Sequence, residues 1–170
     1  MVEREAQIVR VARVLAVASV AAALMIGYGF GANYLRFLQW SRGANANLTS
    51  AIARGVTDGG ELSLEVEFEA PPVGYRAQIE TMEFSLLGPE GNFGYYRVIV
   101  PEGLAVWEDN GVSALLSLYS HIPSEHWINI RASSGAELDG RLIVRLFLPG
   151  REVPARLPVS APVSIGGGSR

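Results

Sequence analysis

The sequence predicts an all-β domain, a seven-stranded immunoglobulin-like β-sandwich, behind one N-terminal transmembrane α-helix. The nineteen residues Val14–Ala32 carry no charged side chain, and such a run is typical of a membrane-spanning helix. From Gly60 onwards, apolar and polar residues alternate in short segments separated by turn residues, which is typical of strands with one buried face. A chain of 170 residues is long enough for both parts.

The two parts differ in charge. Residues 1–57 have a net charge of +4 and residues 58–170 a net charge of −7. Because nucleic-acid binding needs clustered positive charge, the second part is not expected to bind nucleic acid. The chain has no cysteine, which excludes disulfides and cysteine-based metal or nucleophile sites.

The apolar run Val14–Ala32 has the right length for a membrane helix. At 1.5 Å per residue it spans roughly 28 Å, close to the ~30 Å hydrocarbon core of a bilayer. Arg10 and Arg13 precede it, and an aromatic and cationic belt is expected where the helix leaves the lipid. The belt residues are Tyr28, Phe30, Tyr34, Arg36 and Trp40. We therefore predict a short tail at 1–13 and a transmembrane helix with an interfacial extension at 14–38.

A cleaved signal peptide is the alternative interpretation of this segment. Signal peptides have an apolar core of ~7–15 residues with a small-residue cleavage site close behind it. The nearest such site, Ala44-Asn45-Ala46, lies well beyond Ala32, which favours an uncleaved signal anchor. Three arginines lie on each side of the helix, so the positive-inside rule does not decide its orientation. We expect a cytoplasmic N-terminus and an extracytoplasmic β domain, the simplest signal-anchor arrangement.

Small residues recur along one stripe of this helix at intervals of four. They are Ser19, Ala23, Gly27 and Gly31. Small side chains allow a second helix to approach closely, so the stripe is a candidate contact with an integral membrane partner or with a second copy in a homodimer. The alternative is that glycine and alanine are simply frequent in membrane helices.

A connector is expected between the helix and the β domain, at residues 39–59, with one helical turn at Ser50–Arg54. The β-sandwich is expected at 60–165 and a disordered tail at 166–170. After a first strand that begins near Gly60, the predicted strands are Ala77–Leu87, Phe93–Val100, Val112–Ser120, Trp127–Ala132, Gly140–Leu148 and Arg156–Ile165. The expected aromatic core residues are Phe68, Phe84, Trp107 and Trp127. Pro154, Pro158 and Pro162 place the last strand at an edge or interrupt it, because proline cannot donate to a central ladder.

The first strand carries the densest charge in the chain. Its apolar residues are Leu62, Leu64, Val66 and Phe68, and its glutamates are Glu61, Glu65, Glu67 and Glu69. Strict alternation places the two sets on opposite faces. The glutamates then form either a solvated outer face or an acidic face that binds a protein.

No set of residues predicts catalysis, a metal or a cofactor. His121, Glu125 and His126 share one segment, whereas a zinc site needs three or four converging ligands, so a solvated loop is the preferred interpretation. Ser120 and Ser124 lack the nucleophile elbow and oxyanion donors that hydrolysis would need. The pair Glu108-Asp109 precedes Asn110-Gly111 and fits a turn better than a calcium loop.

The domain resembles the WHy (water stress and hypersensitive response) or group-two late-embryogenesis-abundant (LEA-2) family. The resemblance rests on LSLEVEFEAPP, YYRVIVPEG, DGRLIVRLFLPG and VPARLPVSAPVSI, and it covers residues 60–165. It implies a stress-linked or envelope-associated β-sandwich without enzymatic activity, often tethered by one membrane helix.

Two functions remain open on the sequence. The first is a non-enzymatic, single-pass membrane-anchored β-sandwich that binds or stabilises an envelope partner. The second is an accessory or assembly subunit of a larger membrane complex, docking through its transmembrane helix.

Overall fold

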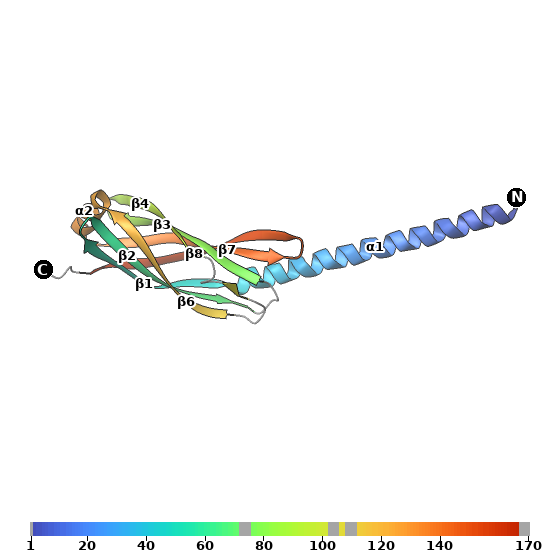
Figure 1. Cartoon of the computed structure of the whole chain (residues 1–170), viewed down its shortest axis with the longest axis horizontal. Coiled ribbons are helices and arrows are strands. Elements are labelled where there is room, and N and C mark those ends of the chain that lie inside the picture. The colour runs from blue at the N-terminus through green and yellow to red at the C-terminus, as the bar shows by residue number, and fades with distance from the viewer. Residues whose placement is uncertain (1, 72–75, 102–105, 108–111, 167–170) are drawn as a thin grey trace. The chain divides into compact units, whose positions relative to one another are not determined.

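The computed structural model describes residues 2–71, 76–101, 106–107 and 112–166, and the side chains of these except 2–12, 106, 107 and 112. The chain divides into two compact units, Met1–Leu38 and Gln39–Arg170. The first unit is helical and the second is a β domain (Figure 1). The predictions for Glu108-Asp109, for the side chain of Trp107 and for the tail from 167 onwards lie outside the described residues.

The elements follow one another along the chain as α1 Val2–Gly43, β1 Asn45–Val56, β2 Gly59–Ala70, β3 Arg76–Gly88, β4 Gly91–Ile99, β5 Val106–Trp107, β6 Val112–Pro123, α2 Ser124–Ala132, β7 Ala136–Leu148 and β8 Arg151–Gly166. Helix α1 starts in the first unit, and its last residues, 39–43, belong to the second.

Helix α1 is long and apolar enough to cross a membrane. Within Arg13–Gly43 an 18-residue window reaches a mean hydropathy of 2.0, and none of that window is buried. Its large side chains are open to the surroundings, among them Leu24 at 68% and Met25 at 70% exposure. Length and composition of this kind also occur in signal sequences.

The β domain is one curled, mixed sheet. Its strand order is β4-β3-β7-β8-β1-β2-β6, with β5 paired to β3. All pairs are antiparallel except the short parallel pair of β1 and β8 at Ile52–Arg54 and Ser164–Gly166. That pair joins two halves, β1-β2-β6 and β4-β3-β7-β8, which lie in front of and behind one another in Figure 1. The prediction of an all-β domain behind a long apolar helix is therefore confirmed.

One apolar core lies inside the curled sheet, and alternation selects its residues. In β2, Leu62, Leu64, Val66 and Phe68 are all 0% exposed, whereas the glutamates between them point outward. In β7 the same period buries Leu138, Leu142, Val144 and Leu146. Because a strand turns alternate side chains to opposite faces, each half contributes one side of a shared core.

Residues 45–56 correct the predicted connector, because they form strand β1 rather than a linker with a helical turn at Ser50–Arg54. Four small or apolar residues of β1 face the core: Ala46, Leu48, Ala51 and Ala53. A bulge between Leu48 and Ser50 changes the parity along the strand. The interrupted period and the small side chains hide the alternation in the sequence.

The predicted strand Trp127–Ala132 is also wrong, because these residues form helix α2, Ser124–Ala132. Trp127 and Ile130 are its buried residues, and their spacing of three places them on one face of a helix. Glu125 in the first turn and Arg131 in the last have the charges that favour the helix dipole. A nine-residue helix is too short to show its period clearly.

Trp40 corrects the predicted aromatic belt. Its side chain is 1% exposed and belongs to the unit Gln39–Arg170. The N–H of Ala44 donates to the carbonyl of Trp40 at 2.7 Å. Trp40 is therefore part of the β-domain core, while Tyr28, Phe30 and Tyr34 are exposed on the helix.

Strand β8 confirms the expected placement of its prolines. Pro154, Pro158 and Pro162 pair with β7 without any break in register, and β8 meets β1 only from Ser164 onwards. Since the three prolines have the same parity, their missing N–H groups all face the unpaired edge of β8.

Candidate functional site

The outer face of β2 is the main charged surface that the sequence singled out. We use the name acidic face for Glu61, Glu65, Glu67 and Glu69, of which Glu67 is half-buried and the other three are exposed. Their neighbours across β1 and β6 are mostly neutral: Asn45, Asn47, Ser50, Ser113, Leu115 and Ser117. Only Glu61 lies opposite a basic residue, Arg54, and beside His121. Backbone alternation therefore brings the four predicted carboxylates together on one face.

The acidic face differs from the outer face of the other half, where several arginine and glutamate side chains form ion pairs. There Arg141 donates to Glu83 at 3.1 Å, Arg97 lies 3.8 Å from the same carboxylate, and Arg145 contacts both Glu80 and Glu152. None of the described ion pairs includes a glutamate of the acidic face. Like charges on neighbouring positions of one strand repel, so a positively charged partner would lower the energy of this face.

Within these ion pairs, the pKa values of Glu83 and Arg145 are shifted. The hydrogen bond from Arg141 is the largest cause that lowers the pKa of Glu83 below its usual 4.5. The hydrogen bond to Glu80 is the largest cause that raises the pKa of Arg145 above its usual value. Both groups therefore stay ionised across the neutral range.

A second cluster joins helix α2 to strand β4. Tyr96 is 7% exposed, and its Oη lies 2.8 Å from Nδ1 of His126. Burial raises the pKa of Tyr96 to about 12, so the phenol keeps its proton and can donate it to Nδ1. On the other side of the ring, Nε2 lies 3.8 Å from a carboxylate oxygen of Glu125. A Cβ at Gly94 would come within 2.7 Å of Nδ1, so glycine makes room for the pair.

This cluster holds α2 on the sheet and lacks the geometry of an active site. The ring of Tyr96 stacks on Phe84 with centroids 5.4 Å apart, so its hydroxyl is placed by core packing. Ser124, the nearest candidate nucleophile in sequence, donates its hydroxyl to the carbonyl of Asp58 at 3.0 Å. The solvated loop expected for His121, Glu125 and His126 is wrong, because His121 lies in β6 and the other two lie in α2. The described residues contain no group of three or more His, Asp or Glu able to hold a metal ion.

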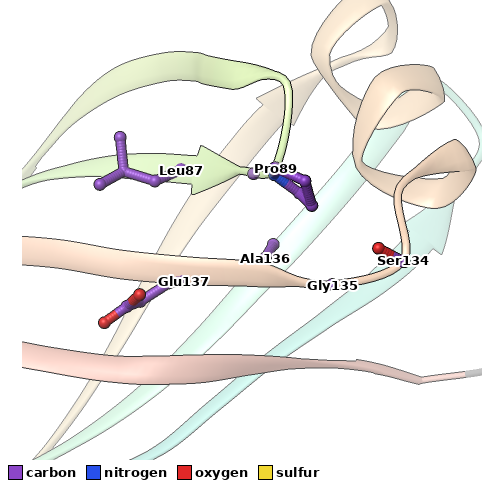
Figure 2. A pocket seen from close by; sticks show the side chains of 7 residues that line it. Leu87, Pro89, Ser134, Gly135, Ala136 and Glu137 are labelled. Atoms are coloured by element: carbon purple, nitrogen blue, oxygen red, sulfur yellow. The ribbon is translucent and has the colours of Figure 1, made fainter.

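Two surface hollows lie around the β3–β4 turn. One of about 490 Å³ is lined by Leu87, Gly88, Pro89, Ser134, Gly135, Ala136 and Glu137. Figure 2 shows Pro89 at the end of β3, Ser134 just before β7 and the carboxylate of Glu137 turned away from Pro89. Glu137 is the one ionisable side chain among these residues, and they include no cation or aromatic ring, so the hollow offers neither a pair of groups for general acid–base chemistry nor a cationic side chain for anion binding.

The predicted helix stripe lies on the first unit. Ser19, Ala23, Gly27 and Gly31 are all exposed, and a Cβ built on Gly27 or Gly31 would meet nothing within 4 Å. The single chain thus leaves room along this stripe and does not show what fills it.

Fold and surface together define a class of protein: a β domain that follows one apolar helix in the chain. One outer face of the domain carries arginine–glutamate ion pairs, and the other carries the acidic face. No protein-family model matches the chain, and no curated protein matches it in sequence. Among solved structures, the structural genomics target SoR45 is similar over 75% of this chain and 90% of its own, with 8% identity and a TM-score of 0.43.

Two further solved structures are similar to this chain. A protein assigned to the late embryogenesis abundant (LEA) proteins, solved in solution, shares 14% identity over 70% of this chain and 68% of its own, with a TM-score of 0.36. The CooA pilin subunit from enterotoxigenic Escherichia coli shares 7% identity over 73% of this chain and 99% of its own, with a TM-score of 0.27.

Proposed function

We propose that this protein is a non-enzymatic, single-pass membrane protein whose β domain binds or stabilises a partner in the cell envelope through the acidic face. The carrying observation is the contrast between the two outer faces: four glutamates without ion pairs on one, and arginine–glutamate networks on the other. A stress-linked role follows from the family resemblance. A basic segment of a partner protein would supply the missing charges.

The strand β1 supports an uncleaved anchor. The nearest signal-peptide site, Ala44-Asn45-Ala46, overlaps the start of β1, where Ala46 is 7% exposed and pairs with Phe68. Cleavage there would also remove Trp40, a core residue of the β domain. Cleavage at Ala44-Asn45-Ala46 would therefore remove core residues from the domain that it releases, so retention of the helix fits the fold better.

The fold also supports a cytoplasmic N-terminus. Arg4, Arg10 and Arg13 lie in the tail, whereas Arg54 on the other side belongs to a strand of the folded domain. Orientation is set by positive charges close to the helix ends, and folded domains translocate largely regardless of charge. The tail then carries the greater weight, which supports an extracytoplasmic β domain.

The second candidate is an accessory subunit that docks through the stripe of α1. The open space along Gly27 and Gly31 favours it, because a partner helix could approach closely there. In this case the β domain would be secondary, and no charge on β2 would be needed.

One comparison in membranes of the native host separates the two functions. Neutralising the acidic face (Glu61→Gln, Glu65→Gln, Glu67→Gln, Glu69→Gln) should abolish co-purification of a stoichiometric partner after gentle detergent extraction. A matched control removes four other exposed charges: Glu90→Gln, Glu125→Gln, Glu137→Gln and Asp139→Asn. It should retain the partner, as should Gly27→Leu with Gly31→Leu. Loss of the partner only in the leucine variant would refute the acidic face and support the accessory subunit.

A further inference from the structure

Strand β6 is an unguarded edge of the sheet. It is the last strand in the order, and β2 is the only described strand hydrogen-bonded to it. Its 12 residues, VSALLSLYSHIP, contain no Lys, Arg, Asp or Glu. Natural proteins usually protect such edges with charges, prolines or short strands. This chain does so on β8, where three prolines line the free edge, whereas β4 and α2 approach β6 without a strand pairing with its outer edge.

Two exposed apolar side chains mark the outer face of this edge. Leu115 is 64% and Tyr119 is 61% exposed, although both lie in regular strand. They stand two residues before and two residues after Ser117, which also points outward. The pattern is therefore symmetric about Ser117.

We propose that β6 pairs with β6 of a second copy of this chain, antiparallel and centred on Ser117. In this register Leu115 of each copy lies opposite Tyr119 of the other, and Ser117 lies opposite its own equivalent. Aromatic–aliphatic cross-strand pairs stabilise antiparallel sheets, so each copy covers the two apolar side chains that the other leaves exposed. The interface is isologous, as closed two-fold dimers require.

Charge does not oppose this pairing. The strand contains no Lys, Arg, Asp or Glu, and its histidine, His121, would lie opposite Ser113. The acidic faces of two copies would be three strand spacings apart, about 14 Å, which exceeds the screening length of about 8 Å at physiological salt. Pairing leaves both acidic faces uncovered, so the proposal stands apart from the proposed function.

Strand β4, at the other end of the strand order, is less suited to such pairing than β6. In β4, Tyr95 and Ile99 are 60% and 72% exposed and are symmetric about Arg97. The same two-fold pairing there would set Arg97 against its own equivalent, and like charges directly opposite destabilise a sheet. Both strands thus have the same spacing of exposed apolar side chains, but the central residue is the charged Arg97 on β4 and the neutral Ser117 on β6.

Cysteine crosslinking of the full-length protein in detergent micelles tests the register, because the native chain has no cysteine to interfere. In the proposed pair, two copies of Ser117→Cys face each other with Cα atoms about 4.5–5.5 Å apart, within the range of a disulfide. Two copies of Ser113→Cys would be about 27 Å apart. Under mild oxidation we expect disulfide-linked dimer from Ser117→Cys and almost none from Ser113→Cys.

A charge on the edge provides the second readout. Tyr119→Lys added to Ser117→Cys should remove most of the crosslinked dimer, whereas Ile99→Lys, an equally exposed change on β4, should leave it. Circular dichroism of each variant checks that the strand signal is retained. Equal crosslinking at positions 113 and 117, no crosslinking at 117, or an equal response to the two lysines would overturn the proposal. Dimerisation through α1 alone would give equal crosslinking at positions 113 and 117.

Discussion

Phe68→Ala should lower the free energy of unfolding of the β domain by about 3–5 kcal/mol. Phe68 is fully buried among the inward residues of β2, and truncation removes an aromatic ring and leaves a cavity that a two-sided core cannot close. Typical domains are stable by about 5–15 kcal/mol, so a large share of the stability would be lost. Urea denaturation, followed by circular dichroism of the strands, measures the change.

Glu67→Ala is the matched control for Phe68→Ala. It lies on the same strand, one residue earlier, on the outer face. Surface changes of this kind alter stability by no more than about 0.5 kcal/mol, and relief of repulsion within the acidic face would make the change favourable. Equal losses for the two variants would show that the register of β2 is wrong.

Gly140→Ala should cost about 3 kcal/mol, because two strands touch at this position. Gly140 pairs with Phe84 across β7 and β3. An added Cβ would come within 2.5 Å of the Cβ and 2.8 Å of the Cα of Phe84, and closer still to the carbonyl of Glu83. Backbone atoms cannot rotate away as a side chain can, so β3 and β7 would have to separate at the centre of their half.

Gly135→Ala, just before the same strand, provides the comparison. An added Cβ there meets nothing within 4 Å, and its expected effect on thermal unfolding is within about 0.5 kcal/mol. If Gly140→Ala melted at the same temperature as Gly135→Ala, the close approach of β3 and β7 would be disproved.

Regular alternation made much of the fold predictable. In Leu62–Phe68 of β2 and Leu142–Leu148 of β7 every second residue is large and apolar, so the buried face and the outward position of the four glutamates could both be inferred from the sequence. The prolines of β8 were informative for a similar reason, since their common parity allows a single free edge.

The errors arose where the period is short or interrupted. In β1 the inward residues are mainly alanines and a bulge shifts their parity, so the segment resembles a connector. In α2, Trp127 and Ile130 are the only buried residues, and two positions do not define a helical period. Trp40 looked like a belt residue because its burial depends on contacts distant in sequence.

Contacts between distant residues could not be predicted at all. Tyr96 and His126 are thirty positions apart, and the sequence around either residue does not indicate a contact with the other. The ion pairs of Glu83 depend on the alignment of β3 with β4 and β7. The contrast between a paired and an unpaired outer face emerged only once strand order was known.

Alkaline carbonate extraction of the full-length protein, with mass spectrometry of its N-terminus, tests the central claim most directly. If α1 anchors the β domain in the membrane without cleavage, the protein should remain in the membrane pellet with residues 1–38 intact. A soluble product that begins near Asn47 would contradict it, because the helix would then be a signal peptide and β1 would lose its first residues.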